Sequence, residues 1–539
     1  MCRPAPGEIL LFVTPGLAFC RRAVPPRWVT RLCLLAAVAW LAGCATRDVE
    51  TLTEPAIQLP AKFDFGGTAP LTNAWWQAFD DPALNQLIDY ALTHNFTVAA
   101  AYARLQQAEA TVEKSRAGLF PTLTGSVSES ATRSSGSNNF SGFSGLSGGA
   151  SGVGGTSDAN SGFFTGGGQG GQSPWSDQQS LGLSASYELD WFGRIRNGLK
   201  ADKLTEEARE AALQSAAVTL TGNIASQWYE YQQNIARVAL LENQIETNQN
   251  VLELTTFSFA NGQAAAADVL RQRRTLAGSR AQLAQAQAQV QVARHALAVL
   301  VGRSSSLFDP PAGQLVDLPA LPATGVPSTT LMQRPDVRQA YYNVASASAS
   351  VAVAIANRFP RLSLSANYSG DNSSSDLFSN WILRLGAELT QPIFDAGLRA
   401  AEVERTRAVV DENVAEYQQT LAEALQEVDD ALINEDRQKV YLKHLRKQLD
   451  ISENVVANLR LRYLRGATDY LDVLDALLTQ QQLQLDLLTG RYQLLDYRIN
   501  LYRALAGPID DRPIGPATDD DADPSAAAEP RRVSSPSSS

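Results

Sequence analysis

The chain has 539 residues, 44% of them hydrophobic and 19% charged, so it is long enough to bury a large core. Its 45 lysines and arginines are outnumbered by 56 aspartates and glutamates, and the net charge of −11 argues against a nucleic-acid-binding role, because phosphate recognition needs a basic surface. No cysteine follows Cys44 and the three histidines show no ligand spacing, so we expect no metal site, cofactor or enzymatic centre in the body of the protein.

Residues 1–43 are predicted to be a secretory signal peptide. Arg27 and Arg31 precede an apolar run that is too short to span a bilayer as a permanent helix. The run ends in Leu41-Ala42-Gly43-Cys44, which resembles the lipobox of bacterial lipoproteins and predicts Cys44 as the acylated first residue of the mature chain. The alternative is an ordinary signal peptide with an incidental cysteine. With a lipobox, residues 44–75 are predicted to be a lipid-anchored N-terminal segment.

The body of the chain contains a sequence repeat, which sets the expected domains. Phe120-Pro121-Thr122-Leu123 matches Phe359-Pro360-Arg361-Leu362 at an offset of 239, and Asp268-Val269-Leu270 matches Asp472-Val473-Leu474 at an offset of 204. The difference places about 35 additional residues in the first copy, in the Gly- and Ser-rich loop at 134–173. The predicted domains are a first repeat over 76–309, a second repeat over 328–507, and a disordered acidic and Ser-rich tail over 508–539.

Four strands are predicted, two in each repeat, at about residues 121–132, 180–192, 359–369 and 381–392. From Leu181 to Trp191, apolar residues alternate with small or acidic ones, and the other stretches show the same period of two. One apolar and one polar face are typical of a transmembrane barrel with a wet lumen, although a half-buried sheet in a soluble protein alternates in the same way. In a barrel, Glu188, Asp190 and Glu388 would face the lumen; otherwise they are exposed sheet residues.

The number of strands bears on the oligomeric state. Four strands are too few to close a barrel, since the smallest barrels have about eight. An open sheet edge is not tolerated in lipid, and the signal peptide and lipobox favour the membrane over a soluble sheet. The membrane interpretation therefore predicts an oligomer in which several chains supply the strands.

Two helical hairpins, at 193–303 and 397–506, are predicted from long stretches without proline that are rich in Ala, Gln, Leu and Glu. Each contains one glycine turn, at Asn261-Gly262 or Arg465-Gly466. Apolar residues spaced by seven predict coiled-coil packing, as in Val269, Leu276, Leu283, Val290 and Leu297. The fold class is therefore an α+β membrane protein, with an internal repeat and a β-barrel continued by a long antiparallel coiled coil.

Several motifs, in the same order along the chain, resemble those of the TolC-like outer-membrane factors of tripartite efflux systems. They are Trp75-Trp76-Gln77-Ala78-Phe79-Asp80-Asp81-Pro82-Ala83-Leu84, Arg334-Pro335-Asp336-Val337, Pro392-Ile393-Phe394-Asp395-Ala396-Gly397 and Tyr463-Leu464-Arg465-Gly466-Ala467-Thr468-Asp469-Tyr470. The resemblance covers about residues 44–507. It implies a homotrimer with a twelve-stranded barrel, four strands from each chain, and a helical tunnel that projects into the periplasm.

The resemblance also implies partners and an activity. The trimer would dock onto a periplasmic membrane-fusion adaptor and an inner-membrane resistance-nodulation-division pump. It would conduct drugs or other small toxic compounds passively to the cell exterior, without catalysis. The alternatives are the outer-membrane duct of a type I protein-secretion system and a non-conducting, envelope-spanning structural coiled coil.

The resemblance finally implies where the channel is gated. Asp472 and Asp475 align with family aspartates at the periplasmic entrance, where three chains would form two carboxylate rings that attract cations. Tyr463 and Asp268 fall where the family has a tyrosine–aspartate bond that holds the tunnel shut. Alternatively, Asp472 and Asp475 lie on a solvated helix face and Asp268 caps a helix. The adaptor would contact the two turns, through Asn261, Gly262, Arg465, Gly466, Ala467 and Thr468, of which Thr468 replaces an arginine of some members.

Overall fold

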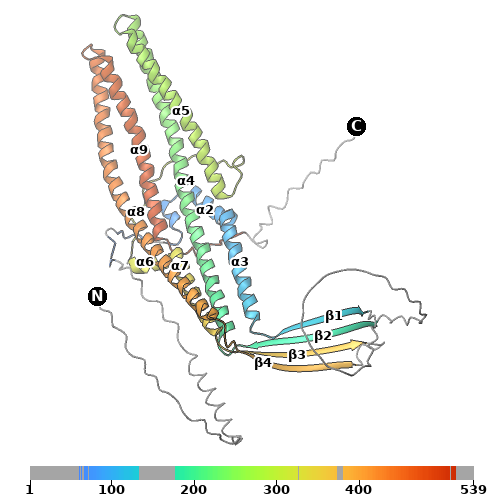
Figure 1. Ribbon diagram of the computed structural model, residues 1–539. Helices are drawn as coiled ribbons and strands as arrows, with labels where there is room; N and C mark the ends of the chain where they lie inside the picture. The colour runs from blue at the N-terminus through green and yellow to red at the C-terminus, as the bar shows by residue number, and fades with distance from the viewer. Residues whose placement is uncertain are drawn as a thin grey trace, which may run out of the picture. The chain divides into compact units, whose positions relative to one another are not determined.

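The computed structural model describes residues 60, 62–63, 66–70, 72–132, 176–325, 327–372, 380–509 and 512–516 (Figure 1). The predicted signal peptide, the acylation site Cys44, the Gly- and Ser-rich loop and the end of the acidic tail lie outside these residues.

The two halves of the chain contain similar elements in the same order. The first half contains η1 (Trp75–Phe79), α2 (Pro82–His94), α3 (Phe96–Ala117), β1 (Thr122–Thr132), β2 (Ser176–Leu189), α4 (Arg194–Ala260) and α5 (Ala266–Val301). The second half contains α6 (Pro327–Gln333), α7 (Pro335–Ala356), β3 (Arg361–Asn372), β4 (Asn380–Thr390), α8 (Leu398–Leu464) and α9 (Tyr470–Leu505). Each half therefore has two short helices, two strands, and a hairpin of a long and a shorter helix.

The four strands form one antiparallel sheet in the order β1-β2-β3-β4. Its register gathers apolar side chains on one face, as in the row Leu183, Tyr368 and Leu383 across β2, β3 and β4. The other face carries mainly polar or small side chains, as in the row Ser184, Asn367 and Arg384. The apolar face is not covered within the chain, since Val127 is 81% exposed and Leu385 is 76% exposed. Strands β1 and β4 are the two edges, and the outer backbone groups of each edge have no partner strand in this sheet.

The long helices form two antiparallel hairpins, α4 with α5 and α8 with α9 (Figure 1). Helices α4 and α8 each contain 67 residues, or about 100 Å at 1.5 Å per residue. Gly262 and Gly466 sit in the connecting turns with φ of +73° and +70°, a left-handed conformation that glycine adopts without strain. The heptad positions Val269, Leu276 and Leu297 are buried along α5. Among the described residues, no helix is both long and apolar enough to cross a membrane.

The main core lies where the hairpins meet the shorter helices. Trp75 and Trp76 are fully buried there, and the Trp75 ring stacks on Tyr502 with centroids 5.6 Å apart. The Trp228 indole donates to Asp81 at 2.8 Å. The Trp-Trp motif is thus part of the core that joins the start of the chain to the end of α9.

In each half, a polar residue at the start of a short helix hydrogen-bonds to the last turn of the hairpin's second helix. At the start of α3, the Asn95 side chain donates to the carbonyl of Leu300 at 2.8 Å. At the start of α7, the Arg334 guanidinium donates to the carbonyl of Ala504 at 2.9 Å. These positions correspond under the sequence offsets of 239 and 204. Each bond satisfies a carbonyl in the last turn of a helix, where intrahelical partners are lacking.

A buried ion pair links α8 to α9. Glu435 is 2% exposed and Arg498 is 1% exposed, and two hydrogen bonds of 2.6 and 2.7 Å join them. The half-exposed Lys439 donates to the same carboxylate at 2.5 Å. Burial alone would raise the pKa of Glu435, but the hydrogen bonds from Arg498 and Lys439 outweigh burial and hold this pKa below its usual value.

The tail that is predicted to be disordered from residue 508 contains residues that pack on the rest of the chain. Ile509 is buried, and its backbone N–H donates to the Gln214 side chain at 2.9 Å. The Arg512 guanidinium pairs with Asp89 and lies over the Trp76 ring, 5.6 Å from its centroid. Ile509 and Arg512 therefore pack on the first half of the chain, within the stretch that is predicted to be disordered.

Candidate functional site

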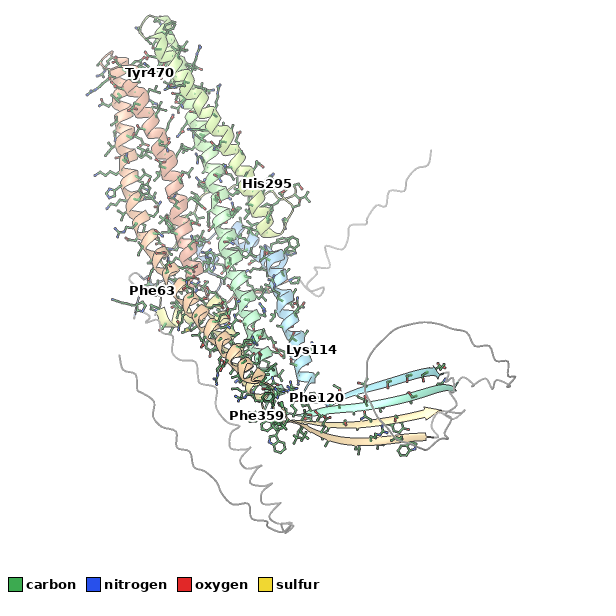
Figure 2. The ribbon with its side chains drawn as sticks, viewed as in Figure 1. Phe63, Lys114, Phe120, His295, Phe359 and Tyr470 are labelled. Atoms are coloured by element: carbon green, nitrogen blue, oxygen red, sulfur yellow. The ribbon has the colours of Figure 1, made fainter. Side chains whose placement is uncertain are left out.

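The candidate site is the pair of turns at the tips of the two hairpins. The first turn joins Ala260 to Ala266, and the second joins Leu464 to Tyr470, which lies at the tips in Figure 2. Of the six residues predicted to contact an adaptor, Thr468 is half-buried and five are exposed: Asn261, Gly262, Arg465, Gly466 and Ala467. Exposed aromatic side chains also lie beside the first turn, with Phe257 68% and Phe259 47% exposed.

Asp472 and Asp475 lie in the first two turns of α9. Both are exposed, and their i,i+3 spacing places them on one face of the helix. The Thr468 hydroxyl donates to the Asp472 carboxylate at 2.5 Å. Thr468 thus helps to position an acidic side chain beside the positive end of the α9 dipole.

Asp268 lies in the first turn of α5. Its carboxylate accepts a hydrogen bond from the backbone N–H of Ala265 at 3.2 Å and another from Arg271 at 3.0 Å. Ala265 is the N-cap residue of α5, and Asp268 follows it by three. Asp268 therefore closes the start of the helix from the third helical position, and not as the N-cap residue itself.

Tyr463, near the end of α8, approaches this part of the first hairpin. Its ring meets the Tyr470 ring edge-on, with centroids 5.8 Å apart. Burial and the nearby charge of Asp268 raise the pKa of Tyr463, while a hydrogen bond with the Ser258 side chain acts in the opposite direction. The structure thus brings Tyr463 and Asp268 together, while the Asp268 carboxylate hydrogen-bonds within its own helix.

The acidic residues predicted for a barrel lumen occupy different places. Glu188 and Glu388 lie on the polar face of the sheet, in one row on either side of Ser363. Arg194 donates two hydrogen bonds, of 2.8 and 2.9 Å, to Glu188. Asp190 lies outside the strand, which ends at Leu189 and not at 192 as expected.

Asp190 serves the start of α4. Its carboxylate accepts the backbone N–H of Arg196 at 2.8 Å and pairs with the Arg196 guanidinium. The chain turns at Gly193, whose φ of +75° ends the extended strand conformation. The period-two pattern in the sequence continues to Trp191, past the end of the strand at Leu189, which is why it overestimates the strand.

The arrangement of helices and sheet has known counterparts. Residues 87–303 and 326–507 match the model of the outer membrane efflux protein family. The chain belongs to this family. It is 31% identical over 489 residues to the probable efflux pump outer membrane protein TtgC of Pseudomonas putida, covering 87% of this chain and 93% of the relative.

Two further comparisons place this outer membrane efflux protein among solved and curated members. The cation efflux system protein CusC of Escherichia coli is 27% identical over 486 residues, covering 87% of this chain and 96% of the relative. A solved structure of the outer-membrane channel OprN is similar with a TM-score of 0.72 and 27% identity, covering 86% of this chain and 100% of that one.

Sequence reasoning missed a buried polar network in this efflux protein, close to the tips. The Tyr470 hydroxyl donates to the Gln272 side chain at 2.6 Å, and Gln272 donates to the carbonyl of Asn248 at 2.8 Å. Burial is the main cause that raises the pKa of Tyr470, to about 12. The spacing of residues in the sequence could have indicated this network. Gln272 and Ser279 lie at intervals of seven from Ala286 and Ala293, so they belong to the same helix seam.

The acidic side chains described at the tips do not gather into a cluster. Within the described ranges, no group of three or more His, Cys, Asp or Glu side chains is placed to hold a metal ion. The exposed carboxylates of Asp472 and Asp475 instead place two negative charges on one face of α9.

Proposed function

We propose that this protein is the outer-membrane channel of a tripartite efflux pump, which passively conducts small toxic compounds from a periplasmic adaptor and an inner-membrane resistance-nodulation-division pump to the cell exterior. The observation that carries the proposal is the four-stranded sheet, with its exposed apolar face and two open edges, at the base of two long hairpins. Membership of the outer membrane efflux protein family supports the same function. Relatives named for toluene efflux and for cation efflux indicate that the fold serves different exported compounds.

The channel is proposed to be a homotrimer. In lipid, the edges β1 and β4 need partner strands, and three copies supply twelve strands that close one barrel. Helix α8 supports this assembly, because apolar side chains about half exposed recur along it: Ile433 at 48%, Val440 at 43%, Ile451 at 52% and Val455 at 44%. A neighbouring copy would cover this stripe.

The periplasmic end is proposed to be a gate. Three copies of Asp472 and Asp475 form two carboxylate rings, which concentrate cations at a narrow entrance. Tyr463 and Asp268 restrain the gate through their proximity at the tips. The exposed turns, with Phe257 and Phe259 beside the first, provide the surface that meets the adaptor.

The mature chain is proposed to be lipid-anchored at the outer membrane through acylated Cys44. This anchor would leave the barrel to span the bilayer and the hairpins to project into the periplasm. Mass spectrometry of the purified N-terminus tests the acylation directly, because a cleaved but unmodified N-terminus would assign residues 1–43 to an ordinary signal peptide.

Single-channel conductance of the purified, detergent-extracted protein in a planar bilayer tests the channel. We expect a low, cation-selective conductance that trivalent cations block. Asp472→Asn with Asp475→Asn is expected to reduce both cation selectivity and block, whereas Asp450→Asn, an exposed change on α8, leaves both unchanged. A confirmed trimer that never conducts would support a structural coiled coil, and a monomer that needs no detergent would refute the membrane assignment.

A further inference from the structure

We propose that a buried network of amide side chains positions the acidic segment of α9 and acts as an additional restraint on the gate. This network, here called the amide ladder, consists of Gln244, Asn248, Gln272, Ser279, Tyr470 and Gln481. The inference rests on the proposed function, because it assigns these residues a role in holding that channel closed.

The ladder joins three helices at its tip end. The Tyr470 hydroxyl on α9 donates to Gln272 on α5 at 2.6 Å. Gln272 then donates from its amide nitrogen to the backbone carbonyl of Asn248 on α4 at 2.8 Å. One glutamine side chain therefore links the second hairpin to both helices of the first hairpin.

The ladder continues through a pair of facing amides. The Asn248 side chain on α4 donates to Gln481 on α9 at 3.4 Å, and Gln481 donates back to Asn248 at 3.2 Å. Asn248 also donates to Ser279 on α5 at 3.0 Å. Gln244, one turn earlier on α4, donates to the Gln481 carbonyl at 3.0 Å.

Because the ladder is buried, its hydrogen bonds select one register of α9 against the first hairpin. Asn248 and Gln272 are 0% exposed, Tyr470 is 4% exposed and Gln481 is 8% exposed. A buried amide without a partner is costly, because it has lost its hydrogen bonds to water. Leucines along a helix seam accept several registers, whereas paired amides accept one, as buried polar residues do in coiled coils. The ladder therefore fixes the register of α9 against the first hairpin.

The two anchor points on α9 lie on either side of the acidic residues. Tyr470 precedes Asp472 by two residues, and Gln481 follows Asp475 by six, so less than two helical turns separate each anchor from an acid. Both carboxylates are exposed and make no bond to the first hairpin that would position them. Their placement relative to the first hairpin thus depends on the ladder at each end of the segment that carries them.

Hydrogen-bonding side chains suit a contact between α9 and the first hairpin that separates when the gate opens. Amides that separate fully regain hydrogen bonds with water, whereas a partial displacement leaves them unpaired. Apolar side chains in the same positions would lose contact with one another and expose apolar area to water on opening. The ladder therefore favours two discrete positions of α9, one paired with the first hairpin and one released from it.

Three variants test the ladder by single-channel recording and by cell permeability to a large antibiotic. Tyr470→Phe removes one hydroxyl and keeps the ring. Asn248→Leu leaves the Gln481 amide without its partner, and Gln481→Leu leaves the Asn248 carbonyl oxygen without its partner. We expect each to raise the resting open probability about tenfold, which is about 1.4 kcal/mol. The double variant Asn248→Leu with Gln481→Leu is expected to return this probability towards the wild-type value, because no unpaired amide remains between the two positions.

Matched controls separate the ladder from general destabilisation. Gln482→Leu changes an exposed amide that bonds within α9 to Asp486, and Tyr441→Phe changes a half-exposed tyrosine on α8. Both are expected to conduct as the wild type does. Trimer content and the midpoint of thermal unfolding are measured for every variant, and Tyr470→Phe is the decisive one because it should fold normally.

Failure of the ladder and failure of the channel are distinguishable. If the wild type conducts and Asp472→Asn with Asp475→Asn alters selectivity, but Tyr470→Phe and both single Leu variants match the wild type, the ladder is not a restraint on the gate. If neither the wild type nor any variant conducts as a confirmed trimer, the proposed channel is refuted and the inference with it.

Discussion

Replacing Glu435 with glutamine should destabilise the packing of α8 against α9. Both members of the Glu435–Arg498 pair are almost fully buried, and hydrogen bonds of 2.6 and 2.7 Å join them. Glutamine has the shape of glutamate but no charge, so the Arg498 guanidinium would remain buried without a counterion. Breaking a buried pair from one side costs about 3–5 kcal/mol. We expect a loss near the lower figure, because Arg498 keeps a hydrogen bond to the carbonyl of Pro319.

The assay is thermal unfolding of the purified trimer in detergent, followed by circular dichroism. Lys439→Met is the matched control, because Lys439 contacts the same carboxylate but its side chain is 45% exposed, and such pairs contribute about 1 kcal/mol or less. Glu435→Leu combined with Arg498→Met removes both charges and is expected to recover much of the loss. Equal effects of Glu435→Gln and Lys439→Met would refute the argument from burial.

Three further changes address acidity, helix ends and a close backbone contact. Folding lowers the pKa of Glu435, so the ionised carboxylate stabilises the folded protein. This stabilisation is complete above the unfolded-state pKa of about 4.3, and it is lost as the pH falls through the folded-state pKa. Acid should therefore lower the thermal unfolding midpoint of the wild type more than that of Glu435→Gln. Asn95→Ala removes the acceptor of two backbone N–H groups at the start of α3, together with the bond to Leu300, and should cost about 1–2 kcal/mol in the same thermal assay. Gly302→Ala should lower the midpoint more than Gly262→Ala: both positions have positive φ, but at Gly302 the added methyl would lie 2.5 Å from a backbone oxygen, whereas Gly262 faces open space.

Much of the architecture follows from local patterns in the sequence. Alternation with a period of two identifies the strands because one face of the sheet is apolar, and long runs without proline identify the hairpins. The family and the efflux function implied by the motifs are confirmed by the match to the outer membrane efflux protein model and by curated relatives. A local pattern overruns the strand at Asp190 and Trp191, because β2 ends at Leu189 while the alternation of apolar and polar residues continues.

The features that could not be predicted from the sequence depend on contacts between residues far apart in the chain. The segment after α9 is rich in aspartate and proline, yet Ile509 is buried against the first half of the chain. Gln272 and Asn248 resemble ordinary helix residues, and only the packing of α9 onto α4 and α5 makes them a network. The Trp75-Trp76 motif indicates the family but does not show that the Trp75 ring stacks on Tyr502.

That stacking has a consequence for how the protein is made. A polypeptide is synthesised from its N-terminus, so Trp75 and Trp76 emerge long before Tyr502, which lies near the end of α9. Until the last helix arrives, two large indole rings lack part of the surface that covers them. Contacts between such distant residues form slowly. The core around the Trp75 ring is therefore completed only after α9 has been synthesised.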